Sequence, residues 1–196
     1  MDPALAGEIE PGLWVGGLGA VKEIRHYGKD GRPWTVVSAL KAEKLSAFLT
    51  TTLQEIRNTH PNLVIHHEVW DIADQSQSDF LSERLEQILH QIDARILVVV
   101  DQQSQGHCLV HCAFGISRSV AICAAWLISR RQLSLATALQ RIRAVRPDAA
   151  PNMGFVAALR ALEQSGGHVA AARQRMAARN RGTATVTLPD TQSSTT

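Results

Sequence analysis

The residues of this chain best suited to chemistry lie in one short run, from His111 to Ser119, which reads HCAFGISRS. It places a cysteine six positions before an arginine, with small side chains and a glycine in between. Such a run favours a turn whose backbone N–H groups point inward, and a nest of this kind at the start of a helix binds anions. Arg118 can close the nest, because its planar guanidinium matches two oxygens of a phosphate. Cys112 would then lie at the base, directed at the phosphorus.

The same surroundings would activate the thiol of Cys112. A free cysteine has a pKa of about 8.5, so it is mostly protonated at neutral pH. The start of a helix, the loop amides and Arg118 all stabilise a thiolate, and cysteines in such surroundings have pKa values of roughly 3.5–7.5. One loop would therefore both bind a dianion and ionise a nucleophile.

The sequence on either side supplies the strand and the helix that such a turn needs. HCLVH (107–111) is a short buried strand, and SVAICAAWLISRR (119–131) is apolar on most faces, as a central buried helix is. ARILVVV (94–100) is predicted as a strand or buried turn, and 182–196 as a disordered tail. Strands alternating with helices, followed by a helical half, predict an α/β domain of about 165 residues. The other predicted strands are 13–17, 35–40 and 62–69, and the other predicted helices are 41–57, 79–92, 134–146, 152–164 and 168–181.

Composition limits the class of protein. The 196 residues are 45% apolar, which is typical of a globular chain long enough for one domain. The cysteines number 3 and have no framework spacing, which favours a reducing compartment over a disulfide-stapled secreted fold. The N-terminus lacks the pattern of a secretory signal, and no run approaches the roughly 18 apolar residues of a membrane span. We therefore expect a soluble protein of the cytoplasm, the nucleus or both.

Charge is unevenly distributed along the chain, although the net charge is only +2. Residues 1–111 carry 9 Lys and Arg against 15 Asp and Glu, whereas residues 112–196 carry 11 against 3. The cysteine loop opens the basic half. Either this half presents a solvated basic helix face, or its charge attracts an anionic ligand.

The spacing His-Cys-x-x-Gly-x-x-Arg-Ser resembles the signature of the cysteine-dependent protein tyrosine phosphatase superfamily, and LVHCAFGISRSVAICAAWLI is most similar to its dual-specificity branch. The similarity covers residues 8–165, with insertions at 28–33 and near 98–105. It implies a catalytic domain over 8–165, built as a central mixed, mainly parallel sheet flanked by helices, with a helical C-terminal half. Residues 166–196 would then form a basic helix and a disordered tail. The further segments that resemble this branch are IEPGLWVGG (9–17), IADQSQSDFL (72–81) and RPDAAPNMGFVAALRALE (146–163).

The resemblance implies an aspartate that protonates the leaving oxygen. Asp71 and Asp74 are the candidates. Matching Asp79 and the two residues after it to the family's Asp-Leu-Leu puts Asp74 at the acid position, with Asp71 as the fallback. Helix capping and loop solvation account for Asp71 and Asp79. Asp74 lies 38 residues before Cys112, further than is usual, and the inserted segment near 98–105 can absorb the difference.

The resemblance also implies roles for the residues of the loop. The thiolate of Cys112 attacks the phosphorus, while Arg118 and the loop amides stabilise the phosphoryl oxygens. Ser119 hydrogen-bonds the departing sulfur, His111 orients the loop and favours the thiolate, and Asn152 buttresses the loop. The residues expected to bind the phosphate are Ala113, Phe114, Gly115, Ile116, Ser117 and Arg118.

The implied reaction needs no metal and no cofactor. Its substrate is phosphorylated protein carrying phosphotyrosine, phosphoserine or phosphothreonine, and a phosphocysteine intermediate is hydrolysed by water. Phe114 stands where the family usually has alanine, and we expect it to reshape one wall of the pocket mouth. No nucleic-acid partner and no membrane span are expected, and the sequence leaves the oligomeric state undefined.

The run from His107 to Ser119 allows four other interpretations. A zinc site would need His107, Cys108, His111 and Cys112 to converge, but alternate residues of a strand face opposite sides. A Cys108–Cys112 disulfide would have to bridge four strand steps, roughly 13 Å, beyond the roughly 7 Å that a disulfide allows. A phosphoinositide phosphatase would share the loop chemistry, although its loop typically adds lysines that are missing here. A phosphoprotein-binding module without turnover is the alternative outside the enzymes.

Overall fold

The computed structural model describes residues 5–27, 31–41, 47–74, 80–96 and 106–183. Its strands are β1 (Ala6–Glu10), β2 (Leu13–Gly16), β3 (Trp34–Ala39), β4 (Ile65–Trp70) and β5 (His107–His111). They form one sheet in the order β1-β2-β5-β3-β4. β1 is antiparallel to β2, and the other neighbouring pairs are parallel. The sheet is therefore mixed and mainly parallel, as predicted.

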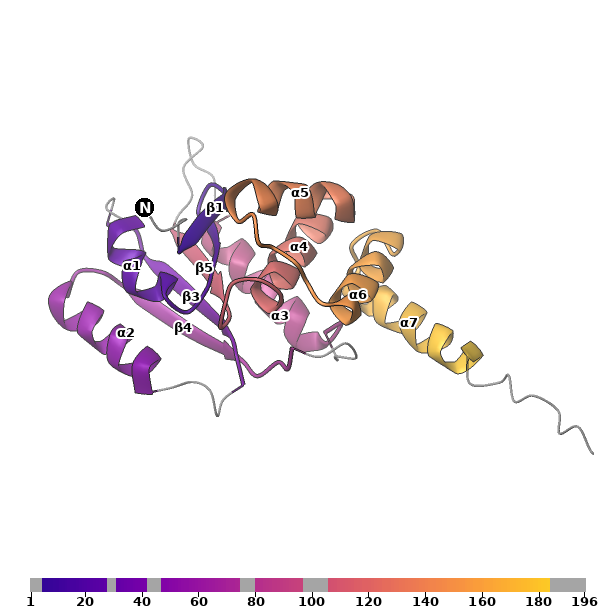
Figure 1. The fold of residues 1–196 in the computed structure, drawn as a ribbon, viewed down its shortest axis with the longest axis horizontal. Coiled ribbons are helices and arrows are strands. Elements are labelled where there is room, and N and C mark those ends of the chain that lie inside the picture. The colour runs from indigo at the N-terminus through magenta and orange to yellow at the C-terminus, as the bar shows by residue number, and fades with distance from the viewer. Residues whose placement is uncertain (1–4, 28–30, 42–46, 75–79, 97–105, 184–196) are drawn as a thin grey trace, which may run out of the picture.

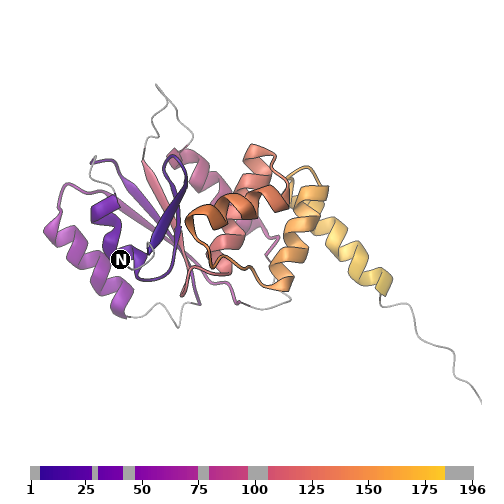
Figure 2. The ribbon, with the colours of Figure 1, turned by 45° about the horizontal axis from the view of Figure 1, so that its top comes forward.

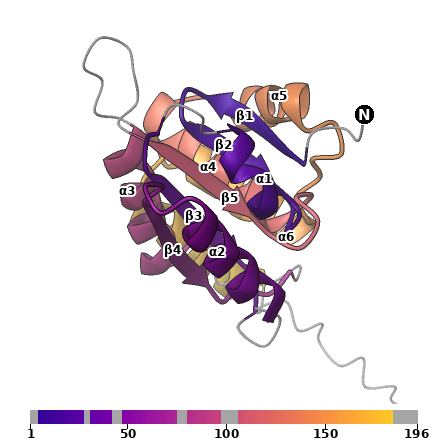
Figure 3. The same ribbon diagram turned by 90° about the vertical axis from the view of Figure 1, so that its left-hand side faces the viewer.

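Helices cover both faces of the sheet (Figure 1). On one face, α1 (Ala20–Tyr27) and α2 (Ala47–Thr59) pack over β3 and β5, and Figure 3 views the molecule from this side. The other face carries α3 (Glu83–Ile96), α4 (Arg118–Arg131), α5 (Leu135–Val145) and α6 (Met153–Gln164). α7 (Val169–Thr183) lies beside α6 at the end of the molecule furthest from α2 (Figure 2). In the ranges described, no helix has the length and apolar character needed to cross a membrane.

α4 is the central buried helix, as its composition predicts. Every residue from Val120 to Ile128 is at most 2% exposed. A helix that is apolar all round must be covered on all sides, and β5, α3, α5 and α6 supply that cover. Its first turn is therefore held rigidly beside the end of β5, where the cysteine loop begins.

The structure adds two elements and corrects two predictions. Neither β1 nor the eight-residue α1 was expected, since each is too short to show a clear period. Residues 94–100 were predicted as a strand or buried turn, but 94–96 complete α3. Ile96 continues the buried stripe of Ile88 and Ile92, which explains the longer helix. The tail was predicted from residue 182, but Gly182 and Thr183 complete α7. Residues 97–100 and the rest of the predicted tail, 184–196, lie outside the described residues.

A polar link joins α3 to α4 within the core. Asp93 accepts a hydrogen bond from Trp126 Nε1 at 2.8 Å and another from Arg130 Nε at 2.6 Å. Trp126 is fully buried, so its N–H has no access to bulk water. Asp93 therefore satisfies a donor that folding would otherwise leave unpaired.

Removing this acceptor tests the link. Asp93→Ala should lower the free energy of unfolding by about 1–3 kcal/mol, because the buried indole N–H of Trp126 loses its acceptor while Arg130 is left with Glu86 as its acidic partner. Urea denaturation followed by circular dichroism measures the change. Glu55→Ala on the exposed face of α2 is the control and should stay within about 0.5 kcal/mol of the parent. Equal losses in the two variants would contradict the assignment.

Candidate active site

The loop from Cys112 to Ser117 connects β5 to α4 at the carboxyl edge of the parallel strands. β5 lies between β2 and β3, with Gly16 on one side of His111 and Ser38 on the other. This edge is where open α/β sheets bind their ligands. Ser117 occupies the N-cap position of α4, but its side chain does not cap the helix and points to another partner.

The carbonyls of the loop are bound by donors from outside it. The backbone N–H of Leu18 donates to the carbonyl of Ala113 at 3.1 Å, and the N–H of Ala150 donates to the carbonyl of Ile116 at 2.8 Å. The first donor follows β2 and the second precedes α6. Two segments far apart in the sequence therefore hold the two ends of the loop.

Arg146 holds the middle of the loop. Its Nη2 donates to the carbonyl of Phe114 at 2.7 Å and its Nε to the carbonyl of Gly115 at 3.3 Å. In a trans peptide the N–H points away from the C=O of the same unit, and none of the described peptides is cis. With four consecutive carbonyls bound outside, the amides of residues 114–117 face the interior of the loop. This arrangement is an anion nest.

Gly115 is required by both conformation and space. Its φ is 71°, in the left-handed region that side chains disfavour. A Cβ built on it would lie 2.6 Å from the carbonyl carbon of Gly16 and 2.6 Å from the nitrogen of Gly17. Gly16 at the end of β2, Gly17 after it and Gly115 of the loop thus allow the two backbones to touch.

Cys112 lies at the base of the nest and is 2% exposed. Its Sγ accepts a hydrogen bond from the N–H of Gly115 at 3.3 Å and lies 3.3 Å from Ser119 Oγ. Burial by itself raises the pKa of this thiol, but hydrogen bonds from Ser119 and Gly115 and the charge of Arg118 outweigh it, so the pKa of Cys112 is lowered. The arrangement favours a thiolate.

The other two cysteines have the opposite character. Both are fully buried. Burial raises the pKa of Cys108 to about 12 and that of Cys123 well above its ordinary value. Because the thiolate is the reactive form, Cys112 is the only nucleophilic candidate among the three.

Asp74 reaches the loop from the segment after β4. Its Oδ1 accepts a hydrogen bond from Ser117 Oγ at 2.7 Å and another from Asn152 Nδ2 at 2.7 Å. Its Oδ2 lies 3.8 Å from Nε of Arg118. That Nε is buried and has no hydrogen-bond partner in the part of the chain that the structure describes. A carboxyl and an unsatisfied guanidinium donor therefore share the mouth of the nest.

Asp71, the fallback acid, is placed differently. It directly follows β4, is exposed, and makes no side-chain hydrogen bond or ion pair with the loop within the described ranges. Asp79 lies outside the described residues. Of the aspartates considered from the sequence, the structure brings Asp74 into contact with the loop.

Asn152 connects α6 to both the loop and Asp74. Its Oδ1 accepts from the N–H of Phe155 at 3.0 Å and so caps α6. Its Nδ2 donates to Asp74, and its backbone N–H donates to Ser117 Oγ at 3.1 Å. The start of α6 thereby fixes Ser117 and Asp74 relative to each other.

His111 acts through hydrogen bonds and carries no charge. Burial lowers its pKa to about 4, so the imidazole is neutral at physiological pH. Its Nδ1 lies 3.3 Å from the carbonyl of Cys112, and its Nε2 lies 2.6 Å from Ser38 Oγ. Ser38 Oγ also lies 2.8 Å from His67 Nε2. One consistent assignment has His67 donating to Ser38, Ser38 to His111, and His111 to the carbonyl of Cys112.

Two residues of this arrangement were not found by sequence reasoning. Ser38 interrupts the apolar strand TVVSAL, and this buried polar position was the available signal. Arg146 lies inside the segment that resembled the family, but nothing in its spacing indicated a contact with the loop carbonyls. That contact depends on the path of the chain between α5 and α6.

Large apolar side chains surround the mouth of the loop. Phe114 is 73% exposed, Met153 is 73% exposed and Ile116 is 38% exposed. Phe114 thus projects outward while its carbonyl is held by Arg146. It borders the entrance and leaves the anion nest itself to backbone amides.

Metal ligands do not converge in the described part of the chain, where no three His, Cys, Asp or Glu side chains form a group. His107, one of the zinc candidates, stacks on Trp34 with ring centroids 4.6 Å apart. Cys108, another candidate, is enclosed in the core.

Comparisons with known proteins agree with this geometry. A family model described as "Dual specificity phosphatase, catalytic domain" matches residues 35–165. Dual specificity protein phosphatase 1 of Arabidopsis thaliana is 30% identical over 164 residues, covering 84% of this chain and 72% of the relative. Human dual specificity phosphatase 28 is 48% identical over 60 residues, covering 31% of this chain and 34% of the relative. The crystal structure of human DUSP28 superposes with a TM-score of 0.62 at 26% identity, covering 83% of this chain and 95% of that chain.

The thiolate at the base of the nest can be measured directly. Titration by ultraviolet thiolate absorbance should show one cysteine ionising below the ordinary range and two that stay protonated into strongly alkaline solution. Ser119→Ala should raise the pKa of the first, because the thiolate loses a hydrogen-bond donor 3.3 Å away.

Ser129→Ala is the matched control, since Ser129 lies on the same helix and its Oγ has no hydrogen-bond partner among the described residues. It should leave the titration unchanged. An unchanged Cys112 titration in Ser119→Ala would show that the hydroxyl does not stabilise the sulfur.

Proposed function

Because the chain belongs to the dual-specificity phosphatase family, we propose that it hydrolyses phosphotyrosine, phosphoserine and phosphothreonine monoesters of proteins through a phosphocysteine intermediate. The family is one of protein phosphatases, and the chain is a protein phosphatase. The observation that carries the finer proposal is the nest of inward amides with a low-pKa cysteine at its base. Backbone N–H groups and Arg118 suit a phosphoryl dianion, and the thiolate suits in-line attack on it.

In the first step, the Sγ of Cys112 forms a bond to phosphorus as the bond from phosphorus to the substrate oxygen breaks. Asp74 gives its proton to that departing oxygen. Its hydrogen bonds to Ser117 and Asn152 support this role, since they hold the carboxyl at the mouth of the nest. The amides of residues 114–117 and the guanidinium of Arg118 stabilise the equatorial oxygens.

In the second step, water attacks the phosphocysteine and the bond between sulfur and phosphorus breaks. Asp74, now a carboxylate, takes a proton from the water. Ser119 stabilises the departing thiolate, a role supported by the 3.3 Å separation of its Oγ from Sγ. Neutral His111 contributes by orienting the carbonyl of Cys112.

We propose residues 8–165 as the catalytic domain, with 166–196 as an addition to it. The three cysteines are free and buried, which supports a reducing compartment and hence the cytoplasm or nucleus. The physiological partner would be a phosphorylated protein. The side chains at the loop positions between Cys112 and Arg118 are uncharged, which supports a monophosphate over a multiply phosphorylated inositol headgroup.

The nucleophile is tested by Cys112→Ser. Its turnover of p-nitrophenyl phosphate and of phosphotyrosine and phosphothreonine peptides should fall by on the order of 10³-fold or more, because the hydroxyl is not ionised at neutral pH. Phosphate release measures the loss, and Cys108→Ala, a change at a core cysteine, should retain activity.

A variant Cys112→Ser with parental activity would overturn the nucleophile. Parental protein that prefers a phosphoinositide would redirect the substrate class. Tight binding of phosphopeptide without any turnover would favour a binding module instead.

The acid is tested through the leaving group. Asp74→Asn should slow hydrolysis of phosphoserine peptides by roughly 10²–10⁴-fold, because an alkoxide leaves poorly without a proton. It should slow p-nitrophenyl phosphate much less, because nitrophenolate leaves unaided. Asp71→Asn is the matched control and should behave as the parent with both substrates. A larger effect in Asp71→Asn, or equal slowing of both substrates in Asp74→Asn, would reject the assignment.

A further inference from the structure

α7 adds a strongly basic helix beyond the part of the chain that matches the family, which ends at residue 165. Its first turns pack on the body through buried Val169 and Ala172, and it then diverges from α6 (Figure 1). The sequence of α7 contains no acidic residue. Its arginines are Arg173, Arg175, Arg179 and Arg181.

A groove of about 420 Å³ lies between α6 and α7. Arg160 and Met153 line it from one face of α6, and Arg175, Met176 and Arg179 line it from one face of α7. No Asp or Glu of the described residues lines this α6–α7 groove. Arg175 donates to the carbonyl of Gln164 at 3.3 Å, a neutral partner that leaves its positive charge in place. The groove therefore combines concentrated positive charge with an apolar floor.

The groove begins next to the candidate active site. Met153, which lines its end, directly follows Asn152, whose side chain donates to Asp74. Arg160 lies eight residues after Asn152, or about 12 Å along the axis of α6 at 1.5 Å per residue. An extended peptide advances about 3.3 Å per residue, so roughly four residues span that distance. A polypeptide bound at the loop can thus place its neighbouring residues in the groove.

We infer that the α6–α7 groove binds an acidic segment of the phosphoprotein substrate, about four to seven residues from the phosphorylated side chain. This inference rests on the proposed function. Arginine guanidiniums would pair with the carboxylates of the segment, and the methionines would pack against its apolar side chains. A groove that combines arginines with methionines suits a polypeptide better than a regular phosphate backbone or a flat lipid surface.

The test compares phosphopeptides that share one phosphorylated core. Two peptides carry Asp and Glu four to seven residues from the phosphorylated residue, one on its N-terminal side and one on its C-terminal side. Two matching peptides carry Asn and Gln at the same positions. At low salt, the parental chain should show a kcat/KM roughly three- to tenfold higher for the acidic peptide on one side, through a lower KM, and added salt should remove the gain.

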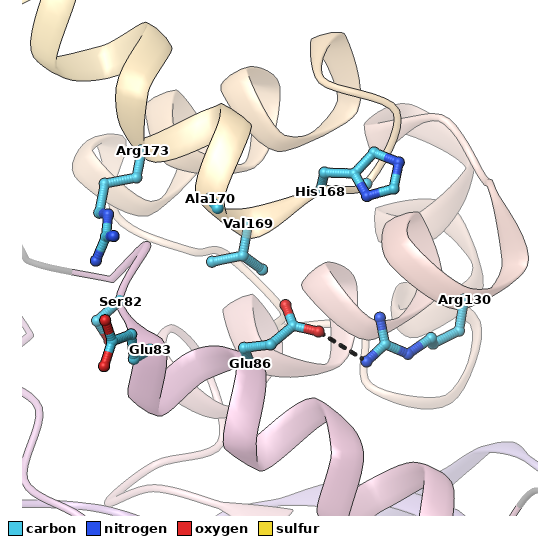
Figure 4. Close-up of a pocket in the computed structure, with 9 residues that line it drawn as sticks. Ser82, Glu83, Glu86, Arg130, His168, Val169, Ala170 and Arg173 are labelled. Atoms are coloured by element: carbon cyan, nitrogen blue, oxygen red, sulfur yellow. Dashed lines mark hydrogen bonds and ion pairs between the residues drawn. The ribbon is translucent and has the colours of Figure 1, made fainter.

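Two variants identify the groove. Arg160→Gln with Arg175→Gln should remove the preference for the acidic peptide, leaving the neutral peptide and p-nitrophenyl phosphate unchanged. Arg173→Gln is the matched control. Arg173 lies on the same helix but lines a different pocket with Glu83 and Glu86 (Figure 4), and its loss should leave the preference intact.

Binding of the unphosphorylated acidic peptide, followed by fluorescence anisotropy, gives a readout that needs no turnover. Peptide binding should weaken when Arg160→Gln and Arg175→Gln are combined, and it should stay at the parental level in Arg173→Gln. If that binding is present while no phosphate ester is hydrolysed, the groove stands and the proposed function fails. Equal kcat/KM for acidic and neutral peptides would overturn the groove while leaving the phosphatase activity in place. Equal losses in Arg173→Gln, or tighter binding of duplex DNA or phosphatidylserine vesicles than of the peptide, would overturn it as well.

Discussion

The direction of four consecutive carbonyls governs the site. Leu18, Arg146 and Ala150 bind the carbonyls of residues 113–116 from outside the loop, and the amides of the following residues must then point inward. One of these amides donates to the sulfur of Cys112, and the same amides are the donors proposed to bind the phosphoryl group. The distant segments that supply these donors also explain why the chemistry needs the whole fold. Neither the strand nor the helix beside the loop could fix its carbonyls alone.

Environment, more than residue type, distinguishes the three cysteines. Cys108 and Cys123 are enclosed by apolar side chains, and burial raises the pKa of each. Cys112 is also buried, but hydrogen bonds and the charge of Arg118 reverse the direction. Environment also sets the charge of His111. Burial lowers the pKa of its imidazole, which therefore remains a neutral link between Ser38 and the loop. Within the loop itself, Arg118 therefore carries the positive charge, beside the position proposed for the phosphate.

Local patterns predicted much of this structure, and long-range contacts were harder to foresee. The spacing of Cys112 and Arg118, the strand before them and the buried helix after them are local features, and each was predicted from the sequence. Asp74 was selected through resemblance, while its contacts with Ser117 and Asn152 depend on how the segment after β4 approaches the starts of α4 and α6. Arg146 and Ser38 escaped notice because their partners lie 29 or more residues away. The end of α3 was misread because a run of β-branched and apolar residues does not reveal whether it continues a helix.

A crystal structure with vanadate bound would test the central claim most directly, because vanadate adopts the geometry of a phosphoryl group in transfer. The account predicts vanadium bonded to the Sγ of Cys112, with its equatorial oxygens within hydrogen-bond distance of the amides of residues 114–117 and of the guanidinium of Arg118. Asp74 should lie against the apical oxygen opposite the sulfur. Vanadate seated away from Cys112, or held by the loop with carbonyls turned toward it, would contradict the account.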